Sequence, residues 1–299
     1  MTRARIALVA SIGAAVALTA SACAPQSSST STATSSASAG GGASATAASC
    51  STTDPNLYKS GQLTVATDSP AYSPWFDNNN PSDGKGFESA VAYAVAAKLG
   101  FSKSQVKWVV EPFDNSYAPG PKDFDFDINE ISITPQRAQA VDFSTGYYTA
   151  DQGVLVLNSS KYAGATSLAQ LKGAKIGVQV ATTSYQAVQD EIKPTHNPSV
   201  YNTTNEEVNA LQDGQIDAIV TDMPTVFYLA SAELSHGRIL GEFTYDSSAP
   251  EQFGLLLKKG SGLTSCVDQA IAGLKSDGTL AQITTQWLSA SADVPRLKQ

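Results

Sequence analysis

The stretch Asp125-Phe-Asp-Ile-Asn-Glu-Ile-Ser-Ile-Thr-Pro-Gln-Arg137 is the most informative feature of this chain. Its apolar part, residues 126–131, predicts a strand, and the hydroxyls of Ser132 and Thr134 follow, with Arg137 three residues further on. The planar fork of a guanidinium matches the two oxygens of a carboxylate. The stretch therefore predicts a carboxylate site at the end of a strand. An arginine that starts a helix and points into solvent is the alternative.

A second segment, Asp213-Gly-Gln-Ile-Asp-Ala-Ile-Val-Thr-Asp222-Met-Pro224, again places a charged residue at the end of a predicted strand, residues 218–221. A zwitterion needs one fixed cation and one fixed anion, and burial strengthens both interactions. Arg137 and Asp222 could supply that pair. Asp222 could equally cap the helix that begins near Pro224, and the two roles can coexist.

These two segments resemble the corresponding motifs of solute-binding protein family 3, the extracytoplasmic amino acid-binding lipoproteins of polar amino acid ABC transporters. The resemblance covers residues 62–288. In that family the arginine at the position of Arg137 grips the α-carboxylate of the ligand, and the aspartate at the position of Asp222 receives its α-ammonium. The resemblance implies a protein that binds a polar amino acid outside the cytoplasmic membrane and delivers it to an ABC transporter permease.

The resemblance implies two aromatic walls in the first lobe. In Thr67-Asp-Ser-Pro-Ala-Tyr-Ser-Pro-Trp75, Tyr72 matches the position that stacks on the ligand, with Trp75 as the second choice. An aromatic side chain there supplies a flat apolar wall with a polar tip, although core packing is the alternative. Phe113 matches a second wall, but residues 115–122 depart from the helix that is usual in the family.

The remaining ligand-binding candidates are polar. Ser132 belongs to the first motif, and Glu130 matches a position whose backbone carbonyl helps to hold the ammonium. That position is commonly small, so a glutamate side chain indicates a different pocket or a cationic ligand. In Gln179-Val-Ala-Thr-Thr-Ser184, Thr182 and Thr183 match a loop whose backbone N–H groups meet the carboxylate from the second lobe. Gln179 matches a position that often selects the ligand's side chain.

Strands alternate with helices along the chain, which predicts an α/β fold with mostly parallel sheets and a ligand at their carboxyl ends. The resemblance implies the two-lobed periplasmic-binding-protein-like fold of type II. Residues 50–149 with 250–299 would form a discontinuous first lobe, and residues 150–249 the second, with hinges near 148–152 and 246–252. We expect strands at 63–67, 106–110, 124–131, 153–157, 175–178, 199–201, 218–221 and 253–257, and helices over 87–99, 184–191, 205–212, 225–231, 263–275 and 280–288.

The N-terminus carries export signals. Arg3 and Arg5 precede an apolar run at 6–20 that is too short to span a bilayer comfortably, and Ala20-Ser-Ala-Cys23 resembles a lipoprotein cleavage box. Residues 1–22 would then be a lipoprotein signal peptide and Cys23 the lipidated N-terminus; an ordinary signal peptide is the alternative. Residues 23–49 are nearly all Ser, Thr, Ala and Gly, which predicts a disordered tether.

Cys50 and Cys266 are the two cysteines of the exported part, and in an oxidising compartment they are expected to form a disulfide. Two free thiols are the alternative. The net charge of −8, without a basic stripe, argues against nucleic acid. Asp123, Asp125 and Asp127 alternate like the start of a calcium loop, but Ile128 replaces its obligatory glycine. We therefore expect no metal and no cofactor.

Three functions are compatible with the sequence. The first is a monomeric, lipid-anchored binding protein on the extracytoplasmic face of the membrane, which is not an enzyme. The second is a dehydratase-like enzyme on the same fold that acts on a small carboxylic acid, with Glu130 as the general acid. The third is an extracellular amino acid sensor that signals through a partner.

Overall fold

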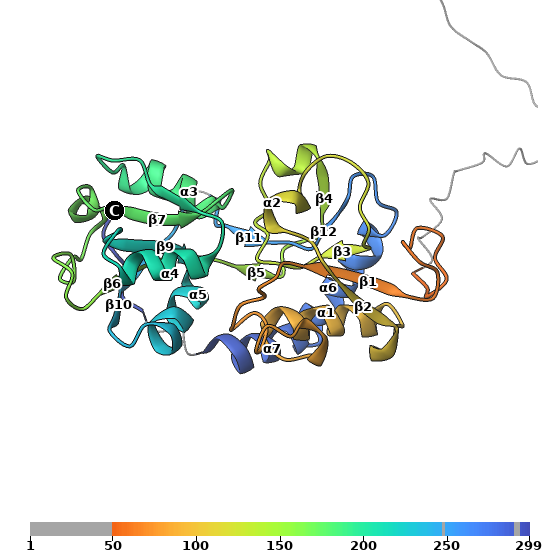
Figure 1. Cartoon of the computed structure of the whole chain (residues 1–299). Coiled ribbons are helices and arrows are strands. Elements are labelled where there is room, and N and C mark those ends of the chain that lie inside the picture. Colours follow the sequence, from red (N-terminus) through yellow and green to blue (C-terminus); the bar gives the residue numbers. More distant parts are fainter. Residues whose placement is uncertain (1–49, 247–248, 290–293) are drawn as a thin grey trace, which may run out of the picture. The chain divides into compact units, whose positions relative to one another are not determined.

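The computed structural model describes residues 50–246, 249–289 and 294–299. The expected signal peptide, Cys23 and the tether lie outside these residues. The described part contains two five-stranded sheets, each covered by helices on both faces, and a two-stranded sheet between them (Figure 1). The first sheet with its helices is called the first lobe below, and the second sheet with its helices the second lobe. The α/β, two-lobed fold expected from the sequence is confirmed.

The first sheet has the order β2-β1-β3-β12-β4. Its first three strands are parallel, and β12 runs antiparallel to β3 and β4. The strands are β1 (Leu63–Thr67), β2 (Val106–Val110), β3 (Phe126–Asp127), β4 (Val141–Phe143) and β12 (Leu256–Lys258).

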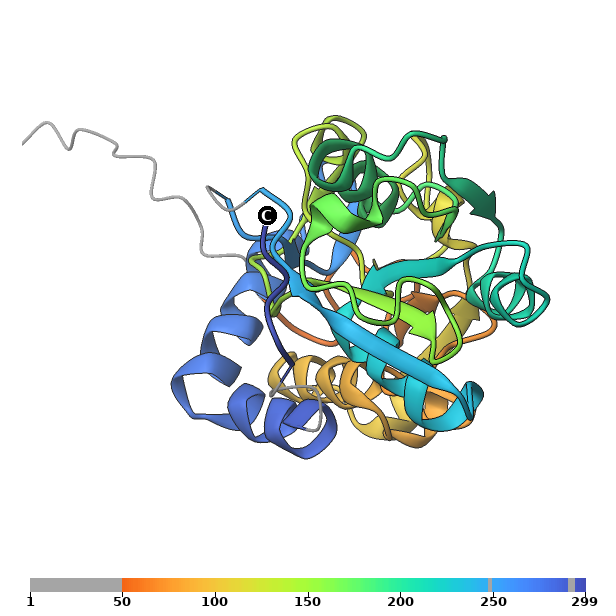
Figure 2. The same ribbon diagram turned by 90° about the vertical axis from the view of Figure 1, so that its left-hand side faces the viewer.

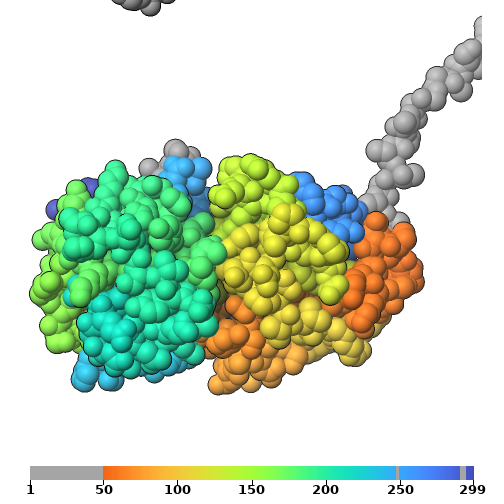
Figure 3. Space-filling view, turned by 45° about the horizontal axis from the view of Figure 1, so that its top comes forward, coloured from red at the N-terminus to blue at the C-terminus, as the bar shows by residue number. Residues whose placement is uncertain are grey.

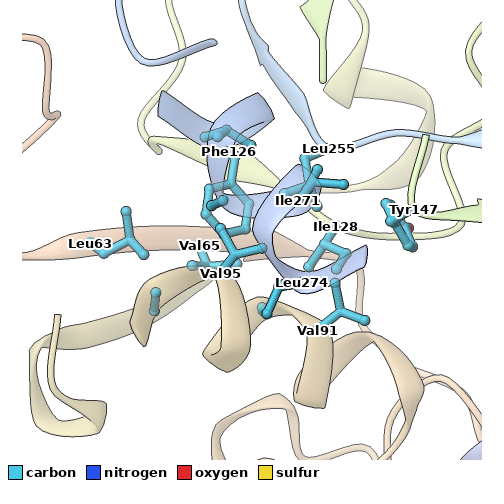
Figure 4. Close-up of a cluster of buried hydrophobic side chains, with 14 of the residues drawn as sticks. Leu63, Val65, Val91, Val95, Phe126, Ile128, Tyr147, Leu255, Ile271 and Leu274 are labelled. Atoms are coloured by element: carbon cyan, nitrogen blue, oxygen red, sulfur yellow. The ribbon is translucent and has the colours of Figure 1, made fainter. Parts of the chain in front are cut away.

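Three helices cover one face of the first sheet: α1 (Phe87–Lys98), α6 (Thr264–Ser276) and α7 (Thr279–Leu288). Figure 2 shows α6 and α7 beside α1. The four-residue spacing of apolar residues in α1 places Val91 and Val95 against Val65 of β1 and Ile271 of α6 (Figure 4). The other face carries the short α2 (Phe113–Ser116) and a smaller cluster around Phe124. The helices η1 (Pro81–Asp83), η2 (Lys103–Gln105) and η3 (Arg137–Gln139) lie in connections.

The second sheet has the order β10-β6-β9-β7-β8, in which β7, β8 and β9 are parallel and β6 is antiparallel to both of its neighbours. Separate apolar clusters fill its two faces. Its strands are β6 (Gln152–Leu157), β7 (Ile176–Gln179), β8 (Ser199–Tyr201), β9 (Ala218–Asp222) and β10 (Gly237–Phe243). Its helices are η4 (Leu168–Leu171), α3 (Thr183–Ala187), η5 (Val188–Ile192), α4 (Thr204–Gln212), α5 (Met223–Tyr228) and η6 (Leu229–Glu233).

Two antiparallel segments connect the lobes. β5 (Tyr148–Thr149) leads from the first lobe to the second, and β11 (Gln252–Phe253) leads back. The C-terminal residues 294–299 differ from the expected assignment to the first lobe. Leu297 packs in the core of the second lobe, and Arg296 bridges to Glu242 of β10.

Two predicted strands are shorter in the structure than the sequence indicates. The strand expected over 124–131 is regular only at Phe126–Asp127, because Glu130 takes a left-handed conformation with φ 52°. The strand expected over 253–257 is divided at Gly254, which packs against Ile133 of the first motif. The strands β4, β5 and β10 are not predicted.

Cys50 and Cys266 form the expected disulfide, which ties the start of the described chain to α6 across 216 residues of sequence. None of the helices in the described residues is long and apolar enough to cross a membrane.

Candidate functional site

A polar cleft lies between the two lobes, which meet along one face in the space-filling view (Figure 3). Loops that follow β1, β3, β7 and β9 supply most of its walls, so the strand ends meet there as expected for α/β sheets. The cleft is lined by Asp68, Pro70, Tyr72, Phe113, Asn129, Glu130, Ser132, Gln179, Thr182, Thr183, Thr204, Thr221, Asp222 and Thr225. All the ligand-binding residues predicted from the sequence except Arg137 are among them.

Arg137 lies directly behind this lining and is only 7% exposed. Its Nη1 donates to the carbonyl of Ser132 at 2.9 Å, and its Nη2 donates to the carbonyl of Ala181 in the second lobe at 3.0 Å. The guanidinium carbon lies 4.6 Å from the centroid of the Tyr117 ring and 5.4 Å from that of Phe113. Burial lowers the pKa of Arg137, and the neighbouring Tyr117 and acids oppose that shift. The solvated alternative therefore does not describe this arginine.

Asp222 ends β9 and directly precedes α5, but its side chain makes no capping hydrogen bond. Its Oδ1 instead accepts a hydrogen bond from Nε2 of Gln152 at 2.7 Å. Burial raises the pKa of Asp222 well above its ordinary value, and the negative charge of Glu251 raises it further. A cation bound beside Asp222 would relieve this penalty.

Glu130 contributes both its backbone and its side chain to the site. Its N–H donates to Oε1 of Glu88 at 2.6 Å, which holds the left-handed turn that ends the strand. Its Oε2 accepts from Oγ1 of Thr225 at 3.1 Å, and this Oγ1 accepts from Nε1 of Trp75 at 2.7 Å. Burial raises the pKa of Glu130 well above its ordinary value, and the charges of Glu88 and Asp222 add to the shift.

The other predicted residues lie on both sides of the cleft. Tyr72 lines it and accepts a hydrogen bond from the N–H of Asn205 at 3.4 Å, whereas Trp75, the second choice, is buried in the aromatic core. Thr182 caps α3, and its hydroxyl donates to the carbonyl of Gln179 at 2.8 Å. Burial raises the pKa of Tyr72, so its hydroxyl stays protonated and can donate or accept.

Sequence reasoning missed a second set of residues. Asp68 belongs to the same motif as Tyr72, so its position beside the cleft could have been predicted from the sequence. Tyr117 lies in the segment that departs from the family's usual helix. Glu251 lies on the returning crossover and contacts residues more than 60 positions away in sequence, so no local pattern indicates it.

The charges of this site are unbalanced. Among the described residues that line the cleft, Asp68, Glu130 and Asp222 carry carboxylates, and none carries a cationic side chain. Behind the lining, the negative charge of Glu251 raises the pKa of Arg137, and buried Glu88 accepts a hydrogen bond from the N–H of Glu130. Burial raises the pKa of Glu88 to about 7. The arrangement can accept a molecule with one carboxylate and more than one positive charge.

Comparison with known proteins agrees with this geometry. Residues 63–290 match the family of bacterial extracellular solute-binding proteins, family 3. The chain is 28% identical over 220 residues to the ABC transporter glutamine-binding protein GlnH of Bacillus subtilis (strain 168), covering 71% of this chain and 77% of the relative. It is also 28% identical over 209 residues to the ABC transporter arginine-binding protein 1 of Escherichia coli (strain K12), covering 68% and 81%.

A solved structure is similar as well. An ancestral arginine-binding protein bound to glutamine superposes with a TM-score of 0.65 and 30% identity, covering 76% of this chain and 98% of that one. The chain belongs to the bacterial extracellular solute-binding proteins of family 3. Its polar cleft between two lobes is the place where such a protein can enclose a small solute.

Proposed function

We propose that this protein captures an amino acid with a cationic side chain between its two lobes and delivers it to the permease of an ABC transporter. Relatives named for glutamine and for arginine support an amino acid ligand and an ABC transporter as the partner. The charges of the cleft support the cationic class. Its polar and charged residues act in binding, with no catalytic role.

The single observation that carries the proposal is the excess of carboxylates around one guanidinium. The α-carboxylate of the ligand would face Arg137, and its α-ammonium would face Asp222. Glu130 would then be left without a charge partner, since the contacts of its side chain are with the neutral Thr225. A buried carboxylate is costly unless it is paired or protonated. A cationic group at the far end of the ligand would supply that pairing.

Binding of L-arginine, L-lysine, L-ornithine, L-histidine, L-glutamine and L-cystine to the purified protein, measured by thermal shift and then by calorimetry, tests the proposal. The cationic amino acids should bind more tightly than glutamine and cystine. Glu130→Gln should weaken the cationic ligands by about tenfold or more, because it removes a charge-assisted contact. Glu191→Gln, on η5 and away from the lining, is the matched control. It should change neither the affinity for the cationic amino acids nor that for glutamine and cystine.

Preference for a neutral amino acid is the outcome that would contradict the cationic class. If Glu130 and Asp222 share a proton, the site suits a neutral ligand. Glutamine would then bind most tightly, and Glu130→Gln would leave its affinity unchanged. That result would replace the cationic class by a neutral one while leaving the role of Arg137 and Asp222 in place.

We further propose that closure bends the chain near 148–152 and 246–252, a range of which residues 247–248 lie outside the described part of the structure. We also propose that the protein acts as a monomer and that lipid on Cys23 holds it at the outer face of the membrane. The antiparallel pair β5–β11 supports the two hinges. Small residues after an apolar run support the anchor. Cys23→Ser should release the protein from the membrane fraction or block its processing, and light scattering should give the mass of one chain. A variant that is processed and retained normally would contradict the anchor.

A further inference from the structure

The carboxylate of Glu251 lies against two hydroxyls that come from opposite lobes. Its Oε1 accepts a hydrogen bond from Oγ of Ser132 at 2.5 Å and another from Oγ1 of Thr183. Glu251 is on the returning crossover just before β11 and is 8% exposed. It is not part of the cleft lining, whereas Ser132 and Thr183 are.

The number of hydrogens on each hydroxyl determines whether it can donate a hydrogen bond to a ligand or only accept one. A serine or threonine hydroxyl has one hydrogen and two lone pairs, and a carboxylate oxygen has no hydrogen. Both hydroxyls therefore donate to Glu251. The oxygens of Ser132 and Thr183 lie 3.2 Å from each other, so they present their remaining lone pairs side by side.

A neighbouring amide holds the Glu251 carboxylate in this position. Nε2 of Gln152 donates to Oε2 of Glu251 at 3.1 Å and to Oδ1 of Asp222 at 2.7 Å. The opposite orientation of this amide would place its oxygen against two carboxylates. Gln152 is fully buried on β6, so Glu251 is fixed by a rigid strand on one side and by the two hydroxyls on the other.

We propose that Glu251 is a positioning residue that sets ligand specificity: by accepting the hydrogens of Ser132 and Thr183, it makes both hydroxyls acceptors toward the cleft, where they bind the ligand's ammonium. This inference rests on the proposed function and deepens it. The family resemblance implies that backbone N–H groups of the loop at Thr182 and Thr183 meet the ligand's carboxylate, and the inference assigns the Thr183 hydroxyl to the ammonium. The carboxylate is left to Arg137 and to backbone N–H groups.

The test compares two one-ended analogues of L-arginine. Agmatine keeps the amine and lacks the carboxylate, and 5-guanidinopentanoate keeps the carboxylate and lacks the amine. The measured quantity is the Kd of 5-guanidinopentanoate divided by the Kd of agmatine. In Glu251→Ala the freed hydroxyls can donate to a carboxylate, so this ratio should fall by about tenfold or more.

Two variants separate the hydroxyl effect from simple loss of charge. Glu251→Gln removes the charge but keeps an oxygen that accepts both hydroxyls. Its new NH2 group would face Nε2 of Gln152, so the variant is made in a Gln152→Met background, and its ratio should stay within about threefold of the value for Gln152→Met alone. Glu191→Gln, on η5 and outside both the cleft lining and the two crossovers, removes a carboxylate elsewhere and should not change the ratio. Equal shifts in Glu251→Gln and Glu251→Ala would mean that charge alone acts, and would overturn the inference.

Thr183→Val gives a second, sign-sensitive readout. In the wild-type background it should weaken agmatine more than 5-guanidinopentanoate, and in the Glu251→Ala background it should do the reverse. The same sign in both backgrounds would refute the inference. If L-glutamine binds and L-arginine does not, the cationic class fails by itself. The pair 4-aminobutanamide and glutaramate, the corresponding analogues of glutamine, then tests Glu251 in the same way.

Discussion

Replacing Glu88 by glutamine should change how the stability of the protein depends on pH. Glu88 is fully buried on α1, and its Oε1 accepts hydrogen bonds from the N–H of Glu130 and from the hydroxyl of Tyr147. Its other oxygen, Oε2, has no hydrogen-bond partner. Burial raises the pKa of Glu88 from 4.5 to about 7, against the opposing effect of these hydrogen bonds. Glutamine keeps the accepting oxygen and cannot ionise.

The magnitude follows from linkage between proton binding and folding. A rise in pKa from 4.5 to about 7 corresponds to about 3 kcal/mol. Because the folded state binds this proton more tightly than the unfolded state, the contribution is fully present below pH 4.5. It is lost as the pH rises through 7. Asp127 and Glu130, whose pKa values burial also raises, add slope of the same sign. Glu88→Gln removes from their pKa shifts only the part that the charge of Glu88 causes.

Urea unfolding of both proteins between pH 4.5 and pH 8.5, without reductant, measures the effect. The free energy of unfolding of Glu88→Gln relative to wild type should increase by about 3 kcal/mol across this range. Ser89→Ala, which changes a neutral buried side chain on the same helix, should differ from wild type by a constant amount. A constant difference for Glu88→Gln as well would refute the assignment of a protonated, buried Glu88 behind the cleft.

Three further predictions concern ligand binding and the disulfide. The variants Arg137→Ala and Asp222→Ala should each weaken amino acid binding by about 10²–10³-fold, because each leaves one charge of the ligand unmatched. Circular dichroism should show that both stay folded, and near wild-type affinity in calorimetry would place the site elsewhere. The affinity for L-arginine should rise from pH 5 to pH 8, since Glu130 and Asp222 have raised pKa values and must ionise to bind a cation; calorimetry in buffers of different ionisation enthalpy should detect the released protons, and a flat profile would contradict it. Cys50→Ser and Cys266→Ser should each lower the free energy of unfolding by about 2–5 kcal/mol, as should reduction of the wild-type protein, and denaturant midpoints that do not move would argue against a stabilising bridge.

The sequence predicts those elements whose signal lies within the element. The four-residue spacing of α1 identifies its buried face, and the apolar run of β9 ends in the charged residue that the motif indicates. β10 was not predicted, because it is the edge strand of the second sheet and carries Arg238 and Glu242 between its apolar residues. A pattern with mixed polarity is weak evidence for a strand until its partner is known.

In the candidate site, too, local sequence patterns predict some features, while others depend on contacts between distant residues. Strand ends in an α/β fold meet at one edge of the sheet, so the positions of Ser132, Thr183 and Asp222 beside one cleft could be expected from the order of elements. The left-handed turn at Glu130 could not be expected, because this turn depends on Glu88, which is 42 residues earlier in the chain. A contact of that kind is created by folding and leaves no local pattern.

The sense of a hydrogen bond is also decided by the fold. In sequence, Ser132 and Thr183 are two hydroxyls at strand ends, and a hydroxyl can serve a carboxylate or an ammonium equally well. Glu251 removes this choice because it lies within hydrogen-bond distance of both, although it is 119 residues from Ser132 and 68 from Thr183. In the proposed site, the motif residues would determine where an amino acid is held, and Glu251 on the crossover would determine which end of it the hydroxyls contact. Ligand preference in this protein should therefore be altered more selectively at Glu251 than at the motif residues that touch the ligand directly.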